Sequence, residues 1–155
     1  MLKQFSIVLI LLVAGCVNVN GSNYKSNFDT DVLELYSSPM SLQETELLEV
    51  VNDRERFNEI WLSKLGDLGT VPTIDFSKYS IIAIFIGQKS SSGYSVYLDR
   101  VEQNIGTTKI KFVTSQPSPD CVVAQIITSP VTLVRVDKID GGFEFEERTE
   151  IISCR

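Results

Sequence analysis

The chain of 155 residues contains no histidine. Histidine is the commonest general base in enzymes and a frequent ligand of transition metals. Its absence therefore excludes the Ser-His-Asp triad, the Cys-His dyad and most transition-metal sites. We accordingly predict no catalytic residue, no metal site and no cofactor, and we place an enzymatic role behind binding roles.

The chain also lacks a hydrophobic run long enough to cross a membrane, which needs about 20 apolar residues. Its longest such run, residues 7–14, follows Lys3 and ends at Gly15. This layout is typical of a secretory signal peptide, and we expect residues 1–15 to be one. The alternative for Cys16 is a chance cysteine behind an ordinary signal, which would leave an odd thiol in an oxidising compartment.

Residues 13–16 read Val-Ala-Gly-Cys, which resembles the bacterial lipobox. The resemblance implies that Cys16 carries the lipid and becomes the first residue after export. Two or more acyl chains hold a protein stably at a membrane. Val17 is not the Asp that retains many lipoproteins at the inner membrane, so we expect a lipid-anchored protein of the bacterial cell envelope, at the outer membrane.

The negative net charge argues against binding to nucleic acid. The chain has 14 Lys and Arg against 20 Asp and Glu, a net charge of −6, and removal of residues 1–15 changes this to −7. Binding to a polyanion releases counterions through clustered cations, whereas the cations here are scattered among acidic residues. We expect no nucleic-acid partner.

Cysteine is scarce, with three residues in the chain. With Cys16 assigned to lipid, Cys121 and Cys154 remain as an even pair in an exported protein and predict a disulfide. The alternative is two unrelated reduced thiols. A zinc site is disfavoured because two thiolates without histidine do not complete a tetrahedral shell.

The remaining residues divide into a tether and one domain. Residues 16–30 comprise the lipidated Cys and an Asn-, Ser- and Gly-rich stretch, which is typical of a flexible tether. Residues 31–155 suit a single globular domain. A helix is predicted over residues 53–65, with Asn52 as its N-cap, Glu55 completing a capping box and Gly66 after its end.

The rest of the domain is predicted to be β-structure. The run at 79–86 lacks alternation and indicates a strand covered on both faces. We expect a tight hairpin turn at 140–142 and strands over residues 33–36, 47–51, 79–86, 94–99, 109–112, 122–128, 131–138 and 143–152. The fold class is therefore α+β, a mainly antiparallel β-sheet or small barrel with one packed α-helix.

The residues that could form a catalytic or calcium site are better explained as parts of an exposed loop and a solvated strand face. Lys89 and Ser90 could form a Ser-Lys dyad, but they lie in a polar, Gly-flanked segment that indicates an exposed hairpin loop. Acidic residues could suggest glycoside hydrolysis or calcium binding, but two of them alternate with Phe143 and Phe145 as on the solvated face of a strand. These acidic residues are Glu144, Glu146, Glu147 and Glu150.

Two loops are candidates for recognition, with plain connection as the alternative for each. One spans residues 87–93 and offers backbone donors, hydroxyls and a cation. The other spans residues 115–121 and is stiffened by proline, which lowers the entropic cost of binding. The candidate residues are Gly87, Lys89, Ser91, Gly93, Tyr94, Pro117 and Pro119.

Several segments in order resemble the C-terminal domain of the PrcB family, secreted bacterial proteins named for a subunit of a protease complex. They lie within residues 48–140 and comprise Phe57 with Trp61, the stretch 71–77, Gly87-Gln88-Lys89, Gly93-Tyr94 and Ser129-Pro130. The chain departs from the family at Ser92, where the loop usually has a first glycine. This departure puts in doubt a role of the loop that needs that glycine.

The resemblance implies a noncatalytic accessory that associates with a secreted protease. We therefore expect a membrane-anchored, protein-binding lipoprotein whose partners are the membrane, through Cys16, and a secreted or surface protease. Three alternatives remain open. They are a protease inhibitor that presents the loop at Pro117 and Pro119, an envelope structural lipoprotein, and a hydrolase that uses Lys89 and Ser90.

Overall fold

The computed structural model describes residues 32–104 and 106–153. The predicted signal peptide, the predicted lipid-bearing Cys16, the tether at 16–30 and Cys154 lie outside the described residues. Within the described ranges, no helix combines the length and the apolar character needed to cross a bilayer.

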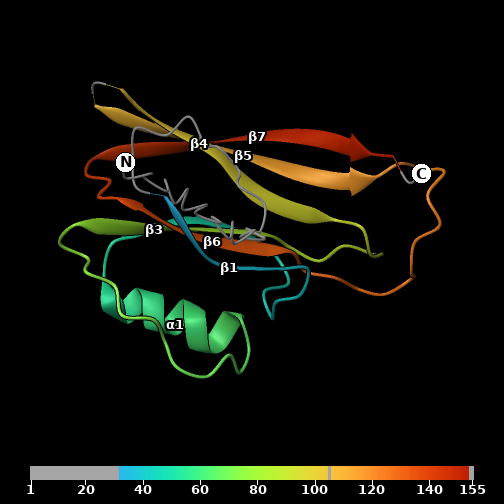
Figure 1. Cartoon of the computed structure of the whole chain (residues 1–155), viewed down its shortest axis with the longest axis horizontal. Coiled ribbons are helices and arrows are strands. Elements are labelled where there is room, and N and C mark those ends of the chain that lie inside the picture. Colours follow the sequence, from blue (N-terminus) through green and yellow to red (C-terminus); the bar gives the residue numbers. More distant parts are fainter. Residues whose placement is uncertain (1–31, 105, 154–155) are drawn as a thin grey trace, which may run out of the picture.

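Seven strands and a helix make up the described part of the chain. They are β1 (Leu33–Ser38), β2 (Glu46–Val51), α1 (Arg54–Lys64), β3 (Tyr79–Ile86), β4 (Ser95–Asn104), β5 (Thr107–Pro117), β6 (Val131–Asp137) and β7 (Gly142–Ile152). The strands form two sheets with the orders β1-β6-β3-β2 and β4-β5-β7. Figure 1 shows α1 against one face of the four-stranded sheet and the three-stranded sheet over the other face.

The described sheets do not close into a barrel, so the open-sheet form of the predicted α+β fold is confirmed. All strand pairs are antiparallel except β5 with β7, which run parallel. Strand β3 has the predicted bounds, and seven of its eight residues are buried. Its alternate side chains enter two separate hydrophobic clusters, one against the three-stranded sheet and one against α1.

The predicted helix is confirmed, but its N-cap was wrong. Asp53 is the cap, and its Oδ1 accepts a hydrogen bond from the backbone N–H of Arg56 at 2.8 Å. Asn52 instead accepts a hydrogen bond from Ser80 and donates to the carbonyl of Ile139 at 3.2 Å. The side chain of Asn52 thus ties the helix entrance to the sheet rather than capping α1.

Two predictions about the strands are wrong, namely the hairpin at 140–142 and the strand at 122–128. The turn at 140–142 has Gly141 at φ 97°, yet it does not form a hairpin, since β6 pairs with β1 and β3 while β7 pairs with β5. Residues 122–128 do not form a strand, and only Thr128 makes an isolated bridge, to Lys89.

Candidate functional site

The two loops predicted for recognition lie against each other at one end of the molecule. Gly93 has φ 94°, and a Cβ atom on it would come within 3.2 Å of the Pro117 ring. Pro117 is the last residue of β5 and lies opposite Ile152 of β7. Residues 87–93 and the end of β5 therefore form one surface, although 24 positions separate Gly93 from Pro117 in the sequence.

Residues 87–93 are not the hairpin tip that the sequence predicted. They connect β3 to β4, which belong to different sheets. The backbones of Lys89 and Thr128 form two hydrogen bonds with each other, at 2.8 and 3.0 Å. The Thr128 hydroxyl also donates a hydrogen bond to the backbone carbonyl of Ser91, a buried residue, at 2.9 Å. The backbone of this segment is thus held in place from both sides, while Lys89 and Tyr94 remain half-buried.

Ser92 fits the backbone at the position where the resembling family usually has glycine. Among the described residues, every positive φ belongs to a glycine, so Ser92 has an ordinary backbone conformation. Its N–H donates to the carbonyl of Ala124 at 2.9 Å, and its hydroxyl accepts the N–H of Ala124 at 3.0 Å. The serine side chain thus adds an attachment that a glycine could not supply.

We call residues 118–127, which lead from β5 towards β6, the arm. The arm runs beyond the C-terminal end of β7 before it turns back to the four-stranded sheet (Figure 1). Its base is fixed by a hydrogen bond from Ser118 N–H to the carbonyl of Ile152 at 3.0 Å, and its middle by the two bonds between Ala124 and Ser92. Pro119 lies exposed near the base.

The arm carries large hydrophobic side chains that face solvent. Val122 is fully exposed, and Ile126 and Ile127 are 53% and 63% exposed. Two further segments at this end expose apolar residues, namely the end of β7 and the loop between β1 and β2, whose Pro39 accepts a hydrogen bond from Ser129. We call the combined surface the apolar end, and it consists of Met40, Leu42, Val122, Ile126, Ile127, Ile151 and Ile152.

Sequence reasoning missed the apolar end because it assigned residues 122–128 to a half-buried strand. The β-branched residues of Val122-Val123 and Ile126-Ile127 favour that assignment. Proline at 119 and at 130 bounds the stretch on both sides, which is also typical of a loop. An apolar stretch in a loop is the signal that could have indicated an exposed binding segment.

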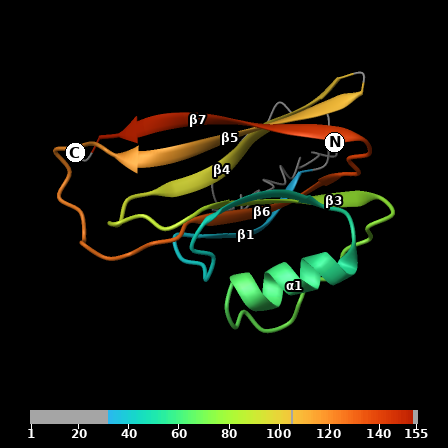
Figure 2. The same ribbon diagram turned by 180° about the vertical axis from the view of Figure 1, so that it is seen from behind.

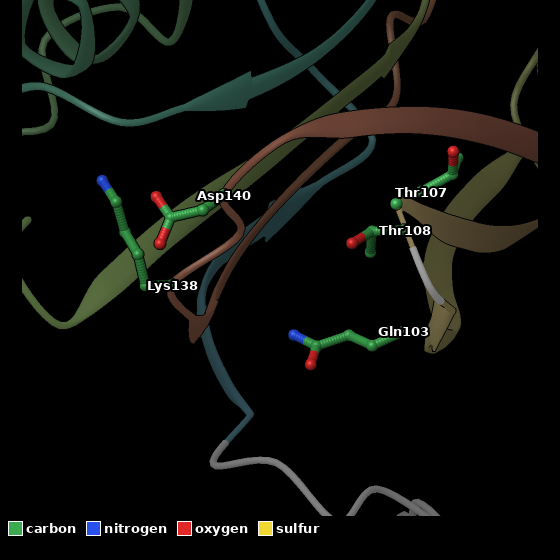
Figure 3. Close-up of a pocket in the computed structure, with 6 residues that line it drawn as sticks. Gln103, Thr107, Thr108, Lys138 and Asp140 are labelled. Carbon is green, nitrogen blue, oxygen red and sulfur yellow. The ribbon is translucent and has the colours of Figure 1, made fainter.

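A polar cleft of about 240 Å³ lies at the opposite end, where the β4–β5 turn approaches the connection from β6 to β7. Figure 3 shows Lys138 and Asp140 on one side, with Gln103, Thr107 and Thr108 across from them. The Lys138 ammonium donates to the carbonyl of Phe76 at 3.0 Å and therefore supports the backbone. The cleft presents neither a histidine nor a cysteine, and no group of three or more ligating side chains occurs in the described parts of the chain.

Two acidic residues of β7, Glu144 and Glu146, form ion pairs with the neighbouring strand, and Glu150 pairs with Arg148 of β7 itself. The Lys109 ammonium lies 2.9 Å from the Glu144 carboxylate and the Lys111 ammonium 3.8 Å from Glu146. The hydrogen bond to Glu144 raises the pKa of Lys109 above its ordinary value. These glutamates lie on the outer, solvated face of the sheet, where the sequence placed them, and the lysines of β5 neutralise part of their charge.

The predicted disulfide falls partly outside the described residues because Cys154 is one of its two members. Cys121 lies at the base of the arm, and its Sγ atom is 3.6 Å from the carbonyl oxygen of Ile152. Ile152 is two positions before Cys154 in the sequence. The geometry of the described partner is therefore compatible with the pairing, which stays a prediction.

Comparison with known proteins finds a family match over part of the chain. No curated protein and no solved structure matches the chain. A family model described as PrcB C-terminal matches residues 80–137, which include β4, β5, β6, nearly all of β3, the segment 87–93 and the arm. Residues 80–137 match the PrcB C-terminal family, which confirms the predicted resemblance over that range; the resembling residues Phe57, Trp61 and 71–77 lie outside the match.

Proposed function

We propose that the protein is a noncatalytic, protein-binding accessory of a secreted protease complex. The family match over residues 80–137 supports a role of this accessory kind. The single observation that carries the proposal is the apolar end, because large hydrophobic side chains exposed together at one end of a domain are typical of an interaction site.

The arm has properties suited to a binding segment. Its apolar side chains face outward, yet its backbone is held by hydrogen bonds at Ser118, Ala124 and the neighbouring Thr128. A segment that is already ordered loses less conformational entropy on binding than a free loop. The surrounding apolar residues from β7 and from the β1–β2 loop enlarge the area that a partner can cover.

We propose that the acylated Cys16 anchors this domain at the bacterial envelope, on the outer membrane. The support is the sequence order of Lys3, the apolar run, and Gly15 before Cys16. The anchor would keep the apolar end close to the membrane surface, where an exported protease passes or resides. In this arrangement the protein acts by contact, and the chemistry belongs to the partner.

The test is crosslinking and affinity purification of the full-length tagged protein from its own membranes, with mass spectrometry of the recovered proteins. The test variant carries Val122→Ser, Ile126→Ser and Ile127→Ser, and the matched control carries Leu33→Ser, Leu62→Ser and Leu68→Ser, which are also exposed. We expect a protease to be recovered, with its yield reduced about tenfold or more by the arm variant only, because apolar anchors dominate interface energetics.

Each other outcome rejects the proposal in a defined way. Equal recovery from the arm variant and the parent would show that the apolar end is not the contact. Recovery of peptidoglycan or porins alone would favour the structural alternative. If the added protein slows hydrolysis of a peptide by the recovered protease, and the arm variant does not, the inhibitor alternative holds. A Cys16→Ser chain that still fractionates with membranes would contradict the anchor.

A further inference from the structure

Strand β7 forms an edge of the three-stranded sheet and extends over eleven residues. A typical strand has about 5–6 residues, and long exposed edges are usually shortened or covered because they can pair with other chains. None of the eleven residues of β7 is buried. Figure 2 shows β7 along the outer margin of the sheet, beyond β5.

Around Lys109 and Lys111 of β5, the charges on the outer face of this sheet alternate in sign from one strand to the next, while Arg148 pairs with Glu150 further along β7. Lys111 of β5 lies between Glu102 of β4, at 3.1 Å, and Glu146 of β7, at 3.8 Å, while Lys109 pairs with Glu144 at 2.9 Å. The side chains of Glu144 and Glu146 are still 52% and 58% exposed. A further strand beside β7 would complete the alternation if it carried cations at the facing positions, since opposite charges on directly opposed residues stabilise a strand pair.

A second copy of this chain is a poor occupant of the same edge. In an antiparallel self-pair centred on Glu147, Glu147 would face itself and Glu144 would face Glu150 of the other copy, whereas Glu146 would face Arg148. Like charges in directly opposed positions destabilise a strand pair. Like-charged pairs outnumber opposite-charged pairs in this register, so the β7 edge matches a strand of opposite charge better than it matches itself.

The edge also leads to the apolar end. β7 finishes at Ile151 and Ile152, which are both exposed, and the carbonyl of Ile152 accepts the hydrogen bond from Ser118 at the base of the arm. An extended segment lying along β7 would therefore reach the hydrophobic side chains of the arm. One partner could use both features, with backbone hydrogen bonds along the edge and apolar contacts at its end.

We propose that β7 accepts an extended segment of a partner protein with Lys or Arg at alternate positions, which adds a fourth strand to the β4-β5-β7 sheet. Strand addition of this kind draws affinity from main-chain hydrogen bonds and specificity from alternate side chains. This proposal rests on the proposed function only in assuming that a protein binds at the β7 edge. Its test does not use the apolar end.

The test measures binding of a capped peptide of alternating lysine and threonine to the full-length protein in detergent micelles. We expect binding that weakens about tenfold when Glu144→Lys and Glu146→Lys are combined, because two favourable cross-strand pairs become repulsive. The matched control combines Glu34→Lys on β1 with Glu46→Lys on β2. Both of these glutamates are exposed on edge strands of the other sheet, and this variant should bind within about twofold of the parent.

Two further measurements separate strand addition from simple charge attraction. A peptide with an N-methyl group on every backbone amide keeps its charges but has no N–H to donate to the ladder, and it should not bind. Hydrogen exchange of the β7 amides should slow when the unmethylated peptide is added. Equal binding of both peptides, unchanged exchange in β7, or equal weakening by the control variant would each overturn the proposal. The partner test with the serine variants of the arm is independent of these results.

Discussion

Gly87 illustrates how a single residue positions the candidate site. It has φ 69°, and a Cβ atom there would lie 3.0 Å from the backbone nitrogen of Glu46 and 3.1 Å from the carbonyl oxygen of Glu44. The next residue, Gln88, donates its N–H to that same Glu44 carbonyl at 2.9 Å. The absence of a side chain at Gly87 therefore allows the chain to leave β3 directly against the segment that precedes β2.

Gly87→Ala should destabilise the fold by about 2 kcal/mol or more, because the left-handed conformation costs an L-residue roughly 1–2 kcal/mol and the backbone contact adds to this. Gly69→Ala is the matched control, since Gly69 has φ 76° and a Cβ atom added there would meet nothing within 4 Å. Urea denaturation of both variants measures the difference. Equal losses in the free energy of unfolding would show that the close approach of Gly87 to Glu44 and Glu46 does not contribute to the cost of the substitution.

The start of α1 shows that residue types alone locate a helix but do not always identify its N-cap. Asn52 and Asp53 are adjacent, and both residue types favour the N-cap position. The choice between them depends on Ser80, which is fully buried 28 positions away and donates its hydroxyl to Asn52. The sequence placed the helix correctly, but it could not show this distant partner.

At the scale of elements, strand β3 was predictable because its pattern is local. Its continuous apolar run indicates burial on both faces, and both faces are in fact covered. The connections were not predictable in the same way. The turn at 140–142 has the glycine of a hairpin, but β7 passes to the other sheet and pairs with β5, and turn chemistry cannot distinguish these two destinations.

The apolar stretch 122–127 fails as a strand for a related reason. β-propensity describes how well a side chain fits a half-buried pleated surface, and in the described structure no strand pairs with these residues. Their hydrophobic side chains remain exposed on the arm. The most important feature of the candidate site thus depended on pairing, which the sequence pattern does not specify.

The charged face of the β4-β5-β7 sheet predicts a pH dependence of stability. The hydrogen bond from Lys111 is the main cause that lowers the pKa of Glu102 below its ordinary value, and Arg100 contributes from 2.7 Å. A carboxylate with a lowered pKa in the folded state stabilises the fold above its unfolded pKa, about 4.3. This contribution disappears as the pH falls through the folded value.

Glu102→Gln should therefore lose less stability than the parent when the pH is lowered from neutral to about 3. Lys111→Met should likewise lose less stability at low pH than the parent, because it removes the main cause of the lowered pKa of Glu102. Urea denaturation at several pH values gives the free energy of unfolding of each protein. Parallel curves for parent and Glu102→Gln would contradict the expected role of this carboxylate.

At the scale of the whole molecule, the candidate site exists because the chain changes sheets twice at the same end. Residues 87–93 carry it from the four-stranded sheet to the three-stranded sheet, and residues 118–130 carry it back. The two crossings meet through Lys89 with Thr128 and through Ser92 with Ala124. The apolar end is therefore a property of the topology, which explains why separate interpretation of each loop gave candidate residues but no surface.

The pairing of Cys121 with Cys154 would join the base of the arm to the end of the chain after β7. The two cysteines are 33 positions apart, and in the loop-entropy model a crosslink of that length stabilises the folded state by roughly 3.5 kcal/mol. The Sγ atom of Cys121 already lies 3.6 Å from the carbonyl oxygen of Ile152. The crosslink would thus limit fraying of the strand end that supports both the arm and the β7 edge.

We expect neither cysteine to react with an alkylating agent in the folded or the denatured protein unless a reductant is added. Cys121→Ser, Cys154→Ser and the double variant should then lose similar stability, because each removes the same crosslink, and the loss should approach about 3.5 kcal/mol in urea denaturation. A double variant that loses twice as much as either single variant would indicate two independent thiols. Alkylation of both residues without reductant would contradict the pairing directly, and the arm would then be held only by the hydrogen bonds described above.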